Sequence, residues 1–336
     1  MPAGLPGGRV SILAPGFRPQ VTCRVPSSPT ARLKPSTDPP PALAGSITAL
    51  ATPFTPAGAL DPDAWRRLID RQLAAGTQAL VVAGSTGEAA ALSSDEFTRL
   101  LQLAVRQVAG QVPVLAGTGQ SATAATIERT RLAADAGADL ALVVTPPYVR
   151  PTAHGLLAHF QAVAERGGLP VVLYNVPGRT GCDLQPETVA QLQQHPGIVA
   201  IKEAKADPQR IAALLQLRQA GFAVLSGDDP TAADAMLAGA DGVVSVASNA
   251  VPAAMRRLCD AARSGDAARA GELDAAVQPL FAFLAVESNP IPLKALLAQL
   301  GYGHRDGIRL PLTPLSAEHL PTVAAMADQV HALESA

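Results

Sequence analysis

Short apolar runs alternate with helix-length amphipathic segments along this chain from Gly45 onward. The runs are rich in aliphatic residues and have the length of buried parallel strands. Eight such runs occur, at Ser46–Ala51, Ala79–Ala83, Val112–Ala116, Leu140–Thr145, Pro170–Tyr174, Val199–Ile201, Ala223–Leu225 and Gly242–Val246. Segments with helical spacing lie between them, at Pro62–Ala75, Ser94–Ala109, Ala122–Ala136, Thr152–Glu165, Pro186–Gln194, Asp207–Gln219 and Pro230–Ala238.

Many helical segments also carry boundary signals. Asp61-Pro62 combines a capping residue with a proline suited to the first helical turn, and Gly76 follows the end of the same segment. Eight parallel strands that alternate with helices predict an α/β fold, a (β/α)8 TIM barrel, over residues 45–250. An open doubly wound sheet is the alternative. It usually has fewer strands and a glycine-rich phosphate loop after the first one, where this chain has Thr52-Pro53-Phe54.

The two ends of the chain differ from this repeat. Residues 1–44 are rich in Pro, Ser, Gly and Arg, and their apolar residues follow neither a helical nor a strand period. This composition predicts a disordered N-terminal extension. They lack the apolar core of a signal peptide. A transit-like segment and an overlong translation start are both consistent with their composition. Residues 251–336 are helical and too long for an eighth barrel helix alone. They predict a C-terminal helical region of three or four helices packed on the barrel.

Charge and composition exclude several classes of function. The chain has 26 basic and 28 acidic residues, a net charge of −2, and no basic block. Neither nucleic acid nor a membrane surface is therefore an expected partner, and no apolar run is long enough to span a bilayer. The cysteines are few, odd in number and widely spaced, so we expect no disulfide framework, no metal site and a cytoplasmic location.

Polar residues follow the predicted strands. In a TIM barrel the carboxyl ends of the strands form the active-site face, so we expect these residues to converge there. They are Thr52, Gly84–Glu88, Gly117–Gly119, Thr145–Tyr148, Tyr174-Asn175, Lys202-Glu203, Gly227–Asp229 and Ser245.

Lys202 interrupts the apolar run of the sixth strand. Desolvating an ammonium is costly, so such a lysine is either paired with an acid or held uncharged. An uncharged lysine is an amine nucleophile that can form a Schiff base with a carbonyl substrate. The alternative is a lysine that reaches solvent at the strand end or pairs with Glu203.

Three other strand-end groups suit the same kind of substrate. The Gly84–Glu88 loop offers backbone amides and hydroxyls to a carboxylate or phosphate, although an ordinary turn has the same composition. Tyr174 could pass protons near Lys202, or be a core tyrosine. Arg179 has the fork that binds carboxylates, or is a solvated loop arginine. The histidines have no metal-ligand spacing, and Asp228-Asp229 is typical of a helix cap.

Taken together, these segments resemble the dihydrodipicolinate synthase and N-acetylneuraminate lyase family of pyruvate-dependent class I aldolases. The resemblance runs from Gly45 to about Leu315. It rests on several spaced motifs in the family's order: Gly45-Ser-Ile-Thr-Ala-Leu-Ala-Thr-Pro-Phe54, Gly84-Ser-Thr-Gly-Glu88, Tyr174-Asn-Val-Pro177, Ile201-Lys-Glu203 and Gly227-Asp-Asp229.

The resemblance implies a role for each matching residue. Lys202 forms the imine with pyruvate, and Tyr174 shuttles protons. Thr86 and neighbouring amides hold the pyruvate carboxylate, with Val244 near the same pocket. Ser85, which stands where the family usually has threonine, links Tyr174 to Tyr148, which reaches in from a neighbouring subunit. A homo-oligomer, at least a dimer and usually a tetramer, is implied, and no metal or organic cofactor, because the lysine is the electron sink.

Two features favour the synthase branch, in which the second substrate is L-aspartate 4-semialdehyde and the pathway is lysine biosynthesis. Arg179-Thr180-Gly181 matches the arginine that holds the carboxylate of that substrate. Asn289-Pro-Ile-Pro-Leu-Lys294 matches a segment of this branch, and we expect it to open a helix of the tail and to carry no chemistry. The alternatives are a lyase of a 2-keto-3-deoxy sugar acid or of N-acetylneuraminate, and a barrel that binds keto acids without turnover.

One departure from the family pattern concerns regulation. Members inhibited by lysine have a polar regulatory pocket, whose histidines, glutamate and first tyrosine are absent here. The corresponding positions are Ala89, Ser94, Phe97, Ser121, Ala125 and Pro147. Without a carboxylate at Ala125 a lysine ammonium loses its main partner, so we expect feedback inhibition to be weak or absent.

Overall fold

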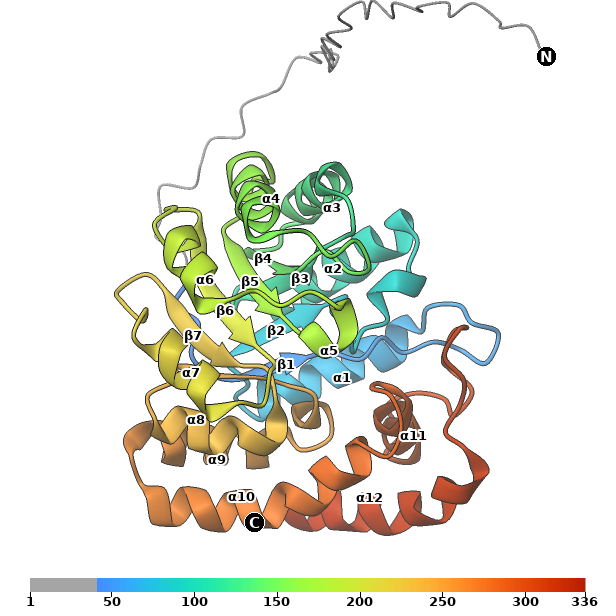
Figure 1. Ribbon diagram of the computed structural model, residues 1–336. Helices are drawn as coiled ribbons and strands as arrows, with labels where there is room; N and C mark the ends of the chain where they lie inside the picture. Colours follow the sequence, from blue (N-terminus) through green and yellow to red (C-terminus); the bar gives the residue numbers. More distant parts are fainter. Residues whose placement is uncertain (1–40, 336) are drawn as a thin grey trace, which may run out of the picture. The chain divides into compact units, whose positions relative to one another are not determined.

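Eight parallel strands close into a barrel in the computed structural model, which describes residues 41–335 (Figure 1). The strands are β1 (Gly45–Ala49), β2 (Ala79–Val82), β3 (Val114–Gly117), β4 (Leu140–Val144), β5 (Val171–Asn175), β6 (Ile198–Glu203), β7 (Ala223–Ser226) and β8 (Gly242–Ser245). Each strand pairs with the next, and β8 returns to β1 with Val244 opposite Ile47. The predicted (β/α)8 barrel is confirmed.

Helices cover the outside of this barrel. They are α1 (Pro62–Ala74), α2 (Ser94–Val108), α3 (Thr123–Asp135), α4 (Ala153–Arg166), α6 (Pro186–Leu192), α7 (Pro208–Leu215), α8 (Ala232–Leu237) and α9 (Pro252–Ser264). Asp61 caps α1 by accepting hydrogen bonds from the amides of Asp63 and Ala64, as its position predicts. The short helix α5 (Pro177–Thr180), directly after β5, was not predicted.

Alternate residues of the strands fill the barrel interior. Ile47, Val81, Leu142, Tyr174 and Val244 belong to one buried cluster inside it. Two further clusters lie between the strands and the surrounding helices. Because a strand exposes successive side chains on opposite faces, a single polar residue at an inward position points into the barrel and cannot reach the helices.

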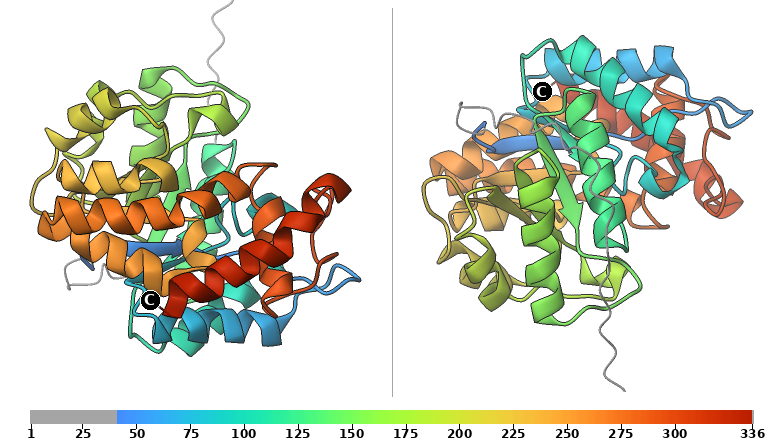
Figure 2. Two further views of the ribbon diagram at one scale, coloured as in Figure 1. Left: turned by 90° about the horizontal axis from the view of Figure 1, so that it is seen from below. Right: turned by 90° about the horizontal axis from the view of Figure 1, so that it is seen from above.

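The C-terminal helical extension is also confirmed. It continues from α9 through α10 (Ala267–Leu284), α11 (Ile291–Gln299) and α12 (Leu320–Ser335). Helix α9 packs against β1 and β8, and α10 and α12 pack against α9 (Figure 2). The segment Asn289–Lys294 therefore lies between α10 and α11 and starts the latter, as predicted.

The described part of the chain begins just before β1. Residues 1–40, most of the predicted N-terminal extension, lie outside it, and Leu43 is buried in the cluster of the barrel interior. Between residues 41 and 335, no helix combines the length and apolar character needed to cross a membrane.

Candidate active site

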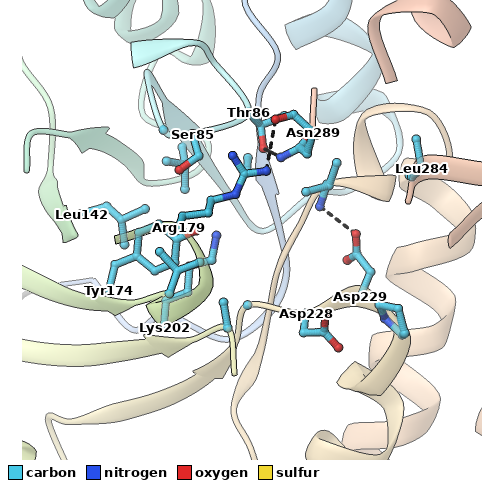
Figure 3. A pocket seen from close by; sticks show the side chains of 18 of the residues that line it. Ser85, Thr86, Leu142, Tyr174, Arg179, Lys202, Asp228, Asp229, Leu284 and Asn289 are labelled. Carbon is cyan, nitrogen blue, oxygen red and sulfur yellow. Dashed lines mark hydrogen bonds between the residues drawn. The ribbon is translucent and has the colours of Figure 1, made fainter. Parts of the chain in front are cut away.

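A cavity of about 270 Å³ opens among the strand ends and the start of the tail. Its walls include Thr86, Tyr174, Arg179, Lys202 and Asn289. Figure 3 shows Lys202 beside Tyr174, and Arg179 reaching across the cavity toward Asn289. The predicted convergence is therefore present in part. The residues that follow β2, β5, β6 and β7 line the cavity, whereas Thr52, Gly117–Gly119, Thr145–Tyr148 and Ser245 do not, and one wall comes from the far end of the chain.

Lys202 points into the mouth of the barrel. Its neighbour Ala200 belongs to the interior cluster, and Ile201 packs beneath the helices, so the alternation of β6 directs Lys202 inward. The side chain is 5% exposed, and Nζ lies 4.3 Å from the centroid of the Tyr174 ring. Within residues 41–335 the lysine ion pairs belong to Lys205 and Lys294, which leaves Lys202 without a carboxylate.

Glu203 lies on the opposite face of β6. Its carboxylate accepts hydrogen bonds from Asn175 Nδ2 at 2.9 Å and forms an ion pair with Arg210 at 3.4 Å. Burial raises the pKa of the Glu203 carboxyl. The alternatives considered for Lys202, solvent exposure and a pair with Glu203, are therefore both wrong.

Gly227 gives the Lys202 side chain its space. A Cβ added at this glycine would lie 2.8 Å from Lys202 Cε, closer than real Cβ contacts allow. The loop after β7 can approach the lysine stem only because position 227 has no side chain.

The loop Gly84–Glu88 has the anion-binding groups expected of it. The amides of Gly87 and Glu88 donate to carbonyls inside the loop. Those of Ser85 and Thr86 donate to no other residue between 41 and 335, and Thr86 is 2% exposed. Two free N–H groups and the Thr86 hydroxyl therefore remain to hold a carboxylate.

The tail holds this loop in place. Glu88 adopts a left-handed backbone conformation, with φ of 52°, which is unfavourable for a residue with a Cβ. Its carboxylate accepts hydrogen bonds from Lys294 Nζ and from the amide of Arg309. The ion pair with Lys294 is buried, so the strained turn is tied to α11 and to the segment after it.

Asn289 contacts both predicted substrate-binding side chains. Its Nδ2 donates to Thr86 Oγ1 at 3.0 Å, and its main-chain oxygen accepts from Arg179 Nη2 at 3.1 Å. The segment Asn289–Lys294 was predicted to carry no chemistry. The only sequence signal for it was the resemblance of this segment to the synthase branch.

The remaining predicted site residues lie at different distances from the cavity. Ser85 lines it, but within residues 41–335 its hydroxyl makes no hydrogen bond to Tyr174 or Tyr148. Tyr148 is 91% exposed, with φ of 73°, and does not line the cavity of its own chain. Val244 is fully buried in the interior cluster, and Val246 lines the cavity instead.

Asp228 and Asp229 join the loops after β7 and β8. Asp228 precedes the 3-10 turn Asp229–Thr231, but its carboxylate accepts from the Thr231 hydroxyl at 2.7 Å and caps no helix amide. The Asp229 carboxylate accepts from the amides of Val246 and Ala247 at 2.9 and 2.8 Å, and burial raises its pKa. Neither carboxylate caps the helix that follows Asp228-Asp229, so the helix-cap interpretation was wrong. Asp229 instead fixes the position of Val246.

Comparisons with known proteins identify close relatives of this chain among curated synthases. The chain is 64% identical over 293 residues to the 4-hydroxy-tetrahydrodipicolinate synthase of Xanthomonas campestris pv. campestris, which covers 87% of this chain and 96% of that protein. It is 46% identical over 285 residues to the synthase of the same name from Pseudomonas aeruginosa, covering 84% and 97%.

Solved structures and a family model give the same answer. The structure of the chloride-inhibited dihydrodipicolinate synthase from Acinetobacter baumannii, complexed with pyruvate, superposes with a TM-score of 0.84 and 41% identity, covering 86% of this chain and 99% of that one. The model of the Dihydrodipicolinate synthetase family matches residues 42–330. The chain therefore belongs to the Dihydrodipicolinate synthetase family.

Proposed function

We propose that this chain condenses pyruvate with L-aspartate 4-semialdehyde to give 4-hydroxy-tetrahydrodipicolinate, a step of lysine biosynthesis through diaminopimelate. The observation that carries the proposal is the amine of Lys202. It is buried, has no acid partner within residues 41–335, lies against the Tyr174 ring, and lines a cavity together with Thr86 and Arg179. A small keto acid with a carboxylate is the substrate that such a site suits.

The first half of the reaction uses pyruvate alone. The Lys202 amine adds to the keto carbon, the oxygen leaves as water, and an imine forms. The imine withdraws electrons, so the methyl carbon loses a proton and becomes an enamine nucleophile. The ring of Tyr174 lies 4.3 Å from Lys202 Nζ, and its phenol is the group to which we assign the proton transfers of these steps.

The second half forms the ring. The enamine carbon attacks the aldehyde carbon, and the aldehyde oxygen takes a proton to become a hydroxyl. The amino group of the adduct then attacks the imine carbon and expels Lys202, so the product is a cyclic imine and the enzyme is regenerated. Thr86 and the amides beside it hold the pyruvate carboxylate, Arg179 holds that of the second substrate, and Val244 supports the pocket from inside the barrel.

A second subunit completes the proton relay in this proposal. Tyr148 is exposed on its own chain and held in a left-handed conformation, as expected of a side chain that enters a neighbouring subunit. Ser85 would then link its phenol to that of Tyr174. We expect a homodimer or homotetramer in solution, although one of the similar solved structures is described as a monomeric variant.

A lyase of sugar acids is the less favoured function. Its substrates carry no second carboxylate at the place that Arg179 serves, and the relatives compared above are named as synthases. An assay of both substrate types distinguishes these functions directly.

Borohydride trapping tests the proposal. Reduction in the presence of pyruvate should add one reduced pyruvyl group to Lys202, which mass spectrometry of the digested protein would locate. Lys202→Ala should lose the adduct and at least about 10³-fold in condensation rate. Lys205→Ala, a change at the nearby half-exposed lysine, is the control. Condensation by Lys202→Ala at a near-normal rate would refute the mechanism.

A further inference from the structure

Within residues 41–335, Asn289 forms hydrogen bonds with both Thr86 and Arg179. Its side-chain amide bonds to Thr86 and its main-chain carbonyl bonds to Arg179, so two opposite walls of the cavity meet at one position of the tail (Figure 3). The amide oxygen Oδ1 has no hydrogen-bond donor within residues 41–335. The contact with Thr86 is therefore the one that orients the amide.

The direction of the hydrogen bond to Thr86 matters for chemistry. A hydroxyl has one hydrogen to donate and two lone pairs to accept with. Asn289 Nδ2 donates to Thr86 Oγ1, which occupies a lone pair and leaves the hydroxyl hydrogen free. No acceptor for that hydrogen exists in the described part of the chain. A carboxylate in the cavity can therefore receive it.

The main-chain carbonyl of Asn289 acts on Arg179 in a similar way. A guanidinium has five N–H donors in a fixed plane. One of them is used by the carbonyl at 3.1 Å, which holds the otherwise exposed side chain across the cavity. The remaining donors stay available for a second carboxylate.

We propose that Asn289 is a positioning residue for both substrates. Its amide turns the Thr86 hydroxyl hydrogen toward the carboxylate of the keto acid, and its carbonyl sets the plane of Arg179 for the carboxylate of the aldehyde substrate. This role rests on the proposed function. The side-chain amide acts on the site of the first substrate through Thr86, and the main-chain carbonyl acts on the site of the second through Arg179.

Asn289→Asp tests the role of the amide. The shape is unchanged, but a carboxylate cannot donate, so the Thr86 hydroxyl turns its hydrogen to Asp and away from the substrate. The pyruvate concentration for half-maximal borohydride trapping should rise by about ten- to a hundredfold, the range for one hydrogen bond to a charged group. This concentration does not depend on the fraction of protein that is folded. Ser288→Ala, at the exposed neighbouring position, should leave it unchanged.

A Thr86→Val background separates orientation from charge repulsion. If Asn289 acts through the Thr86 hydroxyl, Asn289→Asp should add less than about threefold there, because coupled residues are not additive. An effect of the same size in both backgrounds would overturn the proposal, and so would trapping by Asn289→Asp within twofold of the unchanged protein. Absence of trapping in the unchanged protein would instead refute the proposed function.

Discussion

Two buried lysines lie on either side of the same loop and have opposite surroundings. Lys202 and Lys294 are 5% and 6% exposed, and each has an aromatic ring within 4.4 Å of Nζ, Tyr174 and Phe54 respectively. Lys294 also bonds to the Glu88 carboxylate and, at 2.8 Å, to the Thr52 carbonyl. Lys202 has neither kind of partner within residues 41–335.

We infer from this difference that Lys202 is a reactive amine and Lys294 a structural cation. Burial lowers the pKa of Lys294 to about 8, although the Glu88 carboxylate opposes that shift. Two of the three N–H donors of Lys294 are used by the Thr52 carbonyl and the Glu88 carboxylate, which fixes this ammonium in a structural ion pair. Lys202 has similar burial with an open cavity in front of it. Burial alone therefore does not distinguish the two lysines, whereas the acid partner of Lys294, which Lys202 lacks within residues 41–335, does.

The largest expected effect is on stability at Lys294. Lys294→Met leaves the buried Glu88 carboxylate without its cation and should lower the free energy of unfolding by about 3–5 kcal/mol. Urea unfolding followed by circular dichroism measures it. Adding Glu88→Gln should recover part of the loss, and Lys205→Met, at a half-exposed lysine, should change little. A loss below about 1 kcal/mol would contradict a structural role for this pair.

The same substitution at Lys202 should act in the opposite direction. Lys202→Met replaces an unpartnered buried amine with an apolar chain of similar length. It should abolish condensation while raising the free energy of unfolding by about 1 kcal/mol, because the desolvated polar group is removed. Urea unfolding of Lys202→Met, measured alongside Lys294→Met and the unchanged protein, compares the two free energies of unfolding. Destabilisation of similar size at both lysines would mean that the two sites do not differ as described.

Acid should weaken the ion pair that joins Arg309 of the tail to Glu96 of α2. Hydrogen bonds from Arg309, 2.8 Å from Glu96, lower the pKa of Glu96 to about 2 from 4.5. The folded-state pKa lies below the unfolded one, so this contribution is complete above pH 4.5 and is lost as the pH falls toward 2.

Glu96→Gln should therefore remove part of that pH dependence. Because the pair is partly exposed, the difference between the unchanged protein and the variant should be about 1 kcal/mol or less. Urea unfolding at several acidic pH values measures it. Glu272→Gln, in a more exposed pair with Arg269, is the matched control. Identical pH profiles for the Glu96→Gln variant and the unchanged protein would rule out this contribution.

The smallest expected effect is that of free lysine on activity. Phe97 is buried under the guanidinium of Arg129, 4.0 Å from its ring centroid, and the Ser121 hydroxyl donates to the Pro147 carbonyl. Together with the missing carboxylate at Ala125, these contacts favour little or no feedback inhibition. Condensation assays over a lysine titration check this. Half-inhibition at submillimolar lysine would contradict this prediction.

Local pattern was enough to predict most of the fold. Each of the eight apolar runs became a strand, because a parallel strand buried on both faces is apolar throughout. Lys202 stood out for the same reason, as the charged interruption of one run. Composition alone left open whether Lys202 faces the cavity or pairs with Glu203. The alternation of side chains along β6 places the two residues on opposite faces of the strand and so decides for the cavity.

The contacts of the tail could not be predicted in this way. Asn289 is 203 residues from Thr86, and Lys294 is 206 residues from Glu88. A pair this far apart leaves no period or spacing in the sequence. The positions of Val244 and Val246 relative to the cavity also depend on Asp229, whose carboxylate holds the start of the following turn. Such contacts follow from the closed barrel and its packing, not from any single segment.

The attachment of the Gly84–Glu88 loop to Asn289, Lys294 and Arg309 has a consequence for synthesis on the ribosome. A nascent chain can complete all eight strands, and so expose the Lys202 amine, before any of these three residues has emerged. Until they arrive, the loop lacks its three attachments to the tail and the keto acid site is unfinished. Catalysis should therefore begin only when the last part of the chain is made, which keeps incomplete chains from consuming pyruvate.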